Sequence, residues 1–172
     1  MRQWMSAIAV AAVFAGLTAV NAAAQVRPGL SELNLSADIS AMSPEEGDSE
    51  TTMNVQLRYG YFLTPAIQLG AQLSAIKFED VDTFGDVGVF GAYHFGAPGA
   101  MAVPYAGAHV GTGFGFDDSN PFSFGAMAGL KYFLGQAGAI TPELYVTRSS
   151  ADDFNWTTFG LRVGVSVFFG GN

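Results

Sequence analysis

Residues 54–63 read NVQLRYGYFL, and polar and apolar side chains alternate along this stretch. One parity holds Asn54, Gln56 and Arg58, and the other holds Val55, Leu57 and Tyr59. A period of two residues predicts a β-strand with one polar and one apolar face. A soluble sheet turns its apolar face inward, whereas a membrane barrel turns that face outward to lipid. The rest of the chain favours one of these two arrangements.

The composition favours the membrane arrangement. The 172 residues are enough for one domain with a core. Only 13% of them are charged and the mean hydropathy is +0.28, whereas a soluble domain carries about 25% charged residues. Beyond the first residues, no apolar run is long enough for a spanning helix. The absence of cysteine excludes a disulfide framework and thiol chemistry.

The first residues have the features of an export signal. They read MRQWMSAIAVAAVFAGLTAVNAAAQ, with Arg2 near the start, an apolar run and then three alanines at 22–24. We predict a cleaved secretory signal peptide over residues 1–24 and a barrel domain over 25–172. A transmembrane anchor is the alternative, and the small residues followed by Gln-Val-Arg-Pro argue against it. No cysteine follows the apolar run, so this is not a lipoprotein signal.

Alternation recurs in eight segments of about ten or more residues, the length that a tilted strand needs to cross a bilayer. We predict strands at 31–42, 51–64, 66–78, 84–96, 102–116, 121–134, 139–149 and 156–169.

Two chemically different kinds of connection alternate between these strands. Acidic segments lie at 43–50, 79–82, 117–121 and 150–155, and they hold most of the 15 acidic residues. Uncharged segments, each containing a proline, lie at 63–67, 96–104 and 134–142. Regular alternation is hard to obtain in a Greek-key sandwich, where connections cross between sheets. The sequence therefore predicts an all-β, eight-stranded, antiparallel, up-and-down transmembrane β-barrel whose two ends differ.

The two faces of the predicted strands decide which side is outside. In 158–169, the apolar face holds only Leu, Val and Phe, while the opposite face includes Thr158, Gly160, Arg162, Gly164 and Ser166. Small side chains with single charges suit a crowded lumen, whereas the outer face of a lipocalin-like soluble barrel is densely charged. We therefore predict that Val55, Leu57 and Tyr59 face lipid. An aromatic girdle is expected near the uncharged connections, formed by Tyr61, Tyr93, Phe95, Tyr132 and Phe169.

Two stretches resemble the small eight-stranded outer-membrane protein β-barrel superfamily. They are VPYAGAHVGTGFGF (103–116) and the last strand TFGLRVGVSVFF (158–169). The resemblance covers nearly all of the chain after residue 24. It implies a Gram-negative outer-membrane location, contact with membrane lipid and lipopolysaccharide, and recognition of the last strand by the outer-membrane assembly machinery. The chain departs from the family pattern at its end, where Gly170, Gly171 and Asn172 follow the final aromatic residue.

Strand parity also selects the charged residues that should face the lumen. The predicted set is Asp38, Arg58, Asp86, Lys131, Glu143 and Arg162, with His94 and His109 beside it. Charges in a narrow barrel must be paired or hydrated. One interpretation is an ion-pair network that fills and stiffens the lumen. The other is a gate, in which Arg58, Lys131 or Arg162 exchanges partners to open a narrow water path.

No motif in the sequence predicts catalysis or metal binding. Two histidines on neighbouring strands could approach each other, but without Cys or a placed carboxylate they are a weak metal signal. Small barrels that deacylate lipid A resemble this chain in size and carry a His-x-Ser pair. Here His94 is followed by Phe95 and Gly96, and His109 by Val110 and Gly111.

The function expected from the sequence is structural. We expect a monomeric envelope protein with at most narrow, porin-like conductance, no enzyme activity, no cofactor and no nucleic-acid partner. The alternatives are a lipid A-modifying acyl hydrolase or transferase, and a soluble barrel that binds a small ligand.

Overall fold

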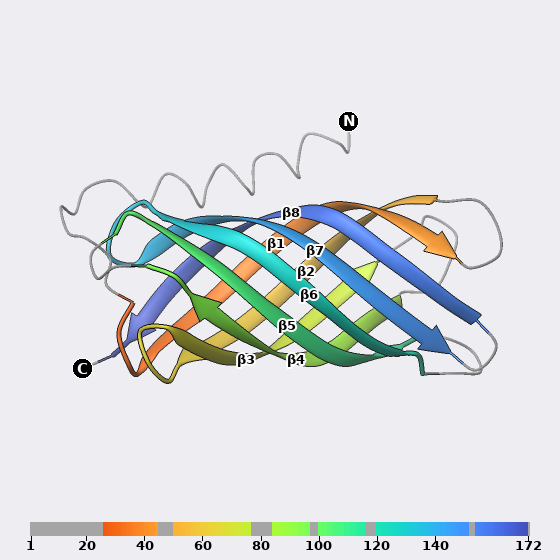
Figure 1. Ribbon diagram of the computed structural model, residues 1–172, viewed down its shortest axis with the longest axis horizontal. Coiled ribbons are helices and arrows are strands. Elements are labelled where there is room, and N and C mark those ends of the chain that lie inside the picture. Colours follow the sequence, from red (N-terminus) through yellow and green to blue (C-terminus); the bar gives the residue numbers. More distant parts are fainter. Residues whose placement is uncertain are drawn as a thin grey trace, which may run out of the picture.

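The computed structural model describes residues 26–44, 50–76, 84–96, 100–115, 120–151 and 154–171. Eight antiparallel strands form one closed barrel in chain order, and the last strand pairs with the first (Figure 1). The strands are β1 (Leu30–Pro44), β2 (Glu50–Phe62), β3 (Ile67–Ile76), β4 (Phe84–His94), β5 (Ala102–Phe114), β6 (Phe122–Phe133), β7 (Gly138–Ala151) and β8 (Phe154–Gly170). The predicted eight-stranded up-and-down barrel is therefore confirmed, with each strand within a few residues of its predicted range.

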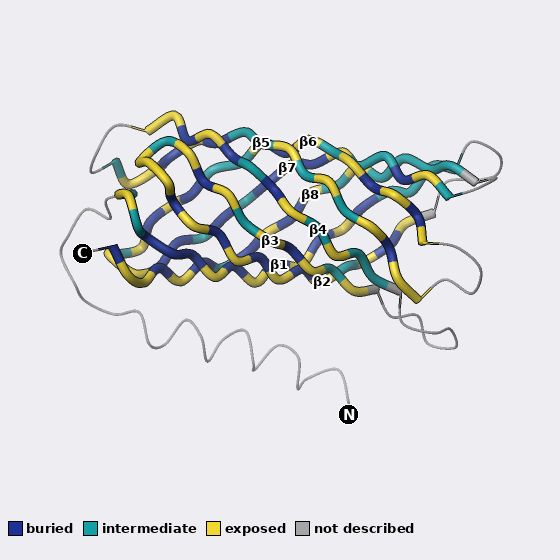
Figure 2. The backbone as a smooth tube through the Cα atoms, turned by 90° about the horizontal axis from the view of Figure 1, so that it is seen from below, coloured by how far each residue is buried: buried dark blue, intermediate teal, exposed yellow. Residues whose placement is uncertain are grey.

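The outside of the barrel is apolar, whereas its inside holds most of the buried polar and charged side chains. On β2, Val55 and Leu57 are 53% and 42% exposed, whereas Gln56 and Arg58 are 3% and 8% exposed. Figure 2 shows exposed and buried positions alternating along much of the barrel. The Val55 and Leu57 side chains therefore point outward, as predicted, and the barrel has the opposite polarity to a soluble one.

The two ends of the barrel differ in their connections. At the uncharged-turn end, Leu63 N donates to Ile67 O and Leu134 N donates to Gly138 O, both at 2.9 Å. These bonds close tight turns after β2 and β6. At the opposite end, called the acidic-loop end below, most residues of the acidic segments lie outside the described residues, as does the predicted signal peptide.

Aromatic side chains project outward at both ends of the barrel. The predicted girdle residues Tyr61, Tyr93, Phe95, Tyr132 and Phe169 are all exposed near the uncharged-turn end. The structure also exposes Phe114, Phe122, Phe124 and Phe159 towards the acidic-loop end, a set that the sequence analysis did not single out. Exposed aromatic residues therefore flank the aliphatic belt on both sides, as at the two interfaces of a bilayer.

The chain segments on either side of the β1–β8 seam meet at the uncharged-turn end. Gly29, Gly170 and Gly171 have φ of 82°, 80° and 72°, a left-handed backbone that favours glycine. Arg27 Nη2 donates to Gly170 O at 3.3 Å. Gly170, the last residue of β8, and Gly171, which follows it, thus both have the left-handed backbone at the point where the chain departs from the family pattern. Within the described part of the chain, no helix is long and apolar enough to cross a membrane.

Candidate functional site in the barrel lumen

Glu143 lies at the centre of a buried charge network. Its two carboxylate oxygens each accept a 2.6 Å hydrogen bond from Arg58, which gives a bidentate pair between β2 and β7. Arg162 Nη1 on β8 donates to the same carboxylate at 3.0 Å. Tyr105 OH donates a further bond at 2.8 Å. Two guanidinium groups and a phenol therefore compensate one buried carboxylate, as a charge removed from water requires.

Arg162 extends the network to β1. Its Nε lies 3.4 Å from Asp38 Oδ2, and its Nη1 donates to Gln56 Oε1 at 2.6 Å. Its guanidinium also lies over the Tyr145 ring, 4.2 Å from the centroid, and Tyr145 OH donates to Asp38 at 2.8 Å. Arg58, Glu143, Arg162 and Asp38 therefore form one connected layer across the lumen.

A second ion pair lies closer to the uncharged-turn end. Lys131 Nζ is 2.6 Å from both oxygens of Glu32. Gln68 Nε2 and Ser166 Oγ donate to the same carboxylate, at 2.6 and 2.5 Å. The sequence analysis placed Lys131 in the lumen but missed Glu32. Its even number on β1, shared with Asp38, was the signal that could have identified it.

An apolar cluster fills the lumen at the uncharged-turn end. Its buried members, called the lumen plug below, are Leu30, Phe62, Val103, Phe133, Ala139 and Phe168. The Phe133 and Phe168 rings lie 5.2 Å apart, and Lys131 Nζ lies 6.0 Å from the Phe168 ring centroid. The sequence analysis did not predict this plug. Its aromatic members occupy the same alternate positions as the polar residues of their strands. Alternation along each strand could therefore have placed them inside.

The two histidines lie in different layers of the lumen. His94 is buried between the rings of Phe62 and Tyr105, at centroid distances of 4.9 and 5.4 Å. His109 shares a 3.1 Å hydrogen bond with Thr147. In the β4–β5 register, His94 pairs with Tyr105, four residues from His109, or roughly 13 Å along a strand. The expectation that the histidines could approach each other is wrong, because the register separates them.

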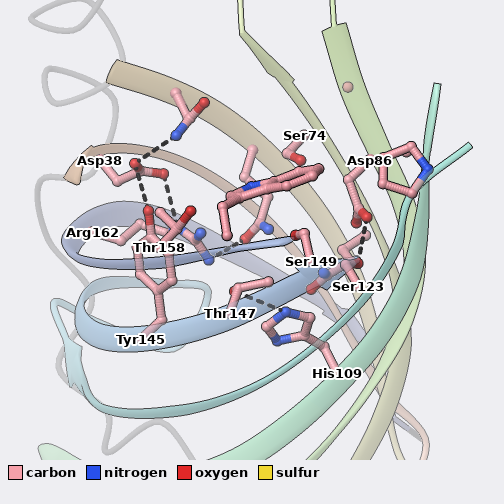
Figure 3. A pocket seen from close by; sticks show the side chains of 17 residues that line it. Asp38, Ser74, Asp86, His109, Ser123, Tyr145, Thr147, Ser149, Thr158 and Arg162 are labelled. Atoms are coloured by element: carbon pink, nitrogen blue, oxygen red, sulfur yellow. Dashed lines mark hydrogen bonds and ion pairs between the residues drawn. The ribbon is translucent and has the colours of Figure 1, made fainter. Parts of the chain in front are cut away.

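Asp86 does not join the arginine network. It accepts a 2.6 Å hydrogen bond from Ser123 on β6. The two residues line a cavity of about 140 Å³ towards the acidic-loop end, here called the vestibule. Figure 3 shows Asp38, Tyr145 and Arg162 on one side of it and Asp86, Ser123 and His109 on the other. The lumen therefore has four levels: plug, Lys131–Glu32 pair, arginine network and vestibule.

The described residues offer little for catalysis or metal binding. No group of three His, Cys, Asp or Glu within them is placed to hold a metal ion. His109 is bonded to Thr147 through Nε2, but its Nδ1 has no hydrogen-bond partner in the described structure. A base that activates a hydroxyl nucleophile needs a third group to orient it. The His109–Thr147 pair lacks that group.

Known protein families and curated proteins give no match to this chain. Solved structures do. Neisserial surface protein A (NspA) is 17% identical with a TM-score of 0.69, covering 81% of this chain and 98% of that one. Ail, the attachment invasion locus protein of Yersinia pestis, is 16% identical with a TM-score of 0.55, and the match covers 83% of this chain and 99% of that one. The outer membrane protein OprG of Pseudomonas aeruginosa is 10% identical with a TM-score of 0.57, and the match covers 86% of this chain and 99% of that one. The chain thus has the fold of the small eight-stranded outer-membrane β-barrels.

Proposed function

We propose that this chain, with its outer-membrane barrel fold, is an integral outer-membrane protein with a structural role in the envelope. Two observations support the location: the apolar belt lies outside, and the solved structures with this fold include outer-membrane proteins. Export would use residues 1–24 as the signal, and assembly would use the last strand. A monomer is favoured because every strand in the closed barrel pairs on both sides and leaves no edge for another chain.

The main support for a structural role is that side chains fill the lumen. A solute crossing the barrel would have to pass the arginine network, then the Lys131–Glu32 pair and then the lumen plug. An eight-stranded barrel has an interior just wide enough for its own side chains. The space between the two ion-pair levels is a cavity of about 10 Å³, no more than one water molecule requires. We therefore expect at most rare, small openings rather than steady, porin-like conductance.

Acyl hydrolysis or transfer is the less supported function. Among the lumen hydrogen bonds of the described residues, the only histidine–hydroxyl pair is His109 with Thr147, and it lacks an orienting carboxylate. We propose that the protein is not an enzyme.

Planar-bilayer recording of the refolded protein tests the structural role. We expect stable insertion with a baseline that stays closed apart from brief, small openings. Arg58→Ala removes the bidentate partner of Glu143 but leaves the lumen plug intact. We expect this variant to change the frequency of openings without giving a steady current.

Insertion itself must be shown independently, by flotation with liposomes and by altered gel migration of unheated samples. A steady conductance in the unaltered protein would contradict the closed lumen and favour a porin-like function. Failure to insert into bilayers at all would favour the soluble-barrel alternative.

A further inference from the structure

The vestibule is a cavity lined largely by polar and charged residues that the structural role does not use. It lies beyond the arginine network, where β2, β4, β6 and β8 begin, and holds about 140 Å³. This is room for several water molecules or for a ligand of a few heavy atoms. Side chains from most strands line the vestibule. The closed barrel therefore fixes the shape of this cavity.

Asp86 gives the vestibule a negative charge without a fixed counter-ion. Its hydrogen bond from Ser123 is a neutral contact. Among the residues that the structure describes, no Lys or Arg forms an ion pair with Asp86. Asp38, the other carboxylate lining the cavity, is already paired with Arg162. A half-buried carboxylate that faces a cavity without a cation is stabilised when a cation enters.

Two residues that line the same cavity each carry a buried side-chain oxygen without a hydrogen-bond partner in the described structure. Gln72 is 5% exposed, and its Oε1 has no hydrogen-bond partner in the described structure. The same holds for Asn54 Oδ1, although Asn54 Nδ2 donates to Asp38 at 3.1 Å. Buried amide oxygens without partners are rare in folded proteins, and their desolvation is compensated only by a donor from water or ligand. The cavity therefore requires donors and positive charge from its occupant.

The cation that lines the vestibule is not available to an anion. Arg162 is engaged with Asp38, Gln56 and Glu143, and it lies over the Tyr145 ring. An anionic ligand would have to displace one of these partners and also approach Asp86. The charges of the cavity therefore select against anions.

We propose that the vestibule binds a small organic cation that carries an ammonium group. Asp86 supplies the counter-charge, and Gln72 Oε1 and Asn54 Oδ1 accept N–H donors. An ammonium group has three donors and no acceptor, which matches this set of oxygens. Trp156 also lines the cavity. A metal ion is less suited, because the described residues place a single unpaired carboxylate at the cavity.

Trp156 supplies a built-in probe for this site. The chain has two tryptophans, Trp4 and Trp156. The Trp4→Phe change leaves Trp156 as the sole tryptophan in protein isolated from the envelope. This holds whether or not the predicted signal peptide has been cleaved. We would titrate this protein with ethanolammonium chloride at fixed ionic strength, with ethylene glycol as the neutral counterpart, and with CaCl₂ and MgCl₂ separately. We expect a saturable change in Trp156 fluorescence with ethanolammonium only.

Charge-matched variants make the test specific. Asp86→Asn keeps the size of the side chain, and we expect it to weaken ethanolammonium binding about tenfold or more. Gln72→Met removes the unpaired oxygen and should weaken binding less. Asp118→Asn removes a charge from an acidic segment outside the described residues and should leave affinity unchanged. Native gel migration and thermal melting check that each variant folds.

Several results would overturn the proposal. They are the absence of saturation, equal binding of ethylene glycol, or equal losses in Asp86→Asn and Asp118→Asn, which would indicate general attraction by the loops. Saturation by Ca²⁺ or Mg²⁺ instead would make the vestibule a metal site and overturn the ammonium assignment.

Discussion

At the residue scale, the arginine network depends most on Arg162, because this cation serves two buried anions. Arg162 contacts both Asp38 and Glu143, whereas Arg58 contacts Glu143 alone among the ion pairs of the described residues. Removing one member of a buried pair leaves an uncompensated charge, which costs far more than the pair contributes relative to apolar residues. The charges of the network are therefore expected to respond together rather than singly.

We predict that Arg162→Ala lowers the free energy of unfolding by about 3 kcal/mol, because Asp38 loses its cation and Glu143 keeps only Arg58. Urea unfolding in detergent micelles or lipid measures this change. Arg27→Ala is the matched control, since Arg27 is exposed and makes a 3.3 Å bond to Gly170 O; its effect should stay within about 0.5 kcal/mol. Equal effects of the two variants would mean that Arg162 is hydrated in solution.

Strand parity identified most of the charged residues that enter the lumen, although Glu32 was missed, but not which of them pair. Arg58 and Glu143 are 85 residues apart in sequence and lie on β2 and β7, which are not neighbours in the sheet. Their contact depends on barrel diameter and stagger, which alternation does not encode. For the same reason Asp86 was grouped with the arginines, although its position near the acidic-loop end pairs it with Ser123.

At the element scale, glycines set how closely neighbouring strands approach inside the barrel. A Cβ built on Gly88 of β4 would lie 2.4 Å from Val110 O and 2.9 Å from Gly111 Cα, both backbone atoms. A Cβ on Gly91 of the same strand would meet Leu69 Cδ2 at 3.2 Å, the end of an exposed, flexible side chain. The two positions therefore differ sharply in tolerance although both are glycine.

We predict that Gly88→Ala lowers the free energy of unfolding by about 1–3 kcal/mol, because the β4–β5 spacing must widen. Gly91→Ala should be neutral or stabilise by up to about 1 kcal/mol, because alanine restricts the unfolded chain. Equilibrium unfolding of the two variants side by side measures the difference. If both lose the same stability, close approach of β5 to Gly88 is not the cause.

The strands themselves were predictable because alternation and proline-containing turns are local signals. The lumen plug was not predicted, since Phe62, Phe133 and Phe168 are apolar residues on otherwise polar faces. Their residue positions place these side chains inside, but their assembly into one plug at one end of the barrel is a property of packing, which alternation does not encode.

At the scale of the whole molecule, the inverted polarity is the feature on which the proposed location depends. An aliphatic belt encircles the barrel between two levels of exposed aromatic residues, while the charged side chains of the described strands gather largely inside. In water such a surface would be a large exposed apolar patch, which soluble monomers avoid. In a bilayer the same surface is solvated by lipid.

Spin-label accessibility tests this account most directly. The chain contains no cysteine, so single cysteines at Leu57, Val89 and Val163, all exposed on the belt, and at Thr51, exposed near the acidic-loop end, can each carry one nitroxide label. In protein reconstituted into liposomes, we predict that labels at the three belt positions relax with oxygen and are shielded from a water-soluble nickel chelate, while the label at Thr51 shows the reverse. Equal access of the nickel chelate to all four positions would contradict membrane insertion of the belt.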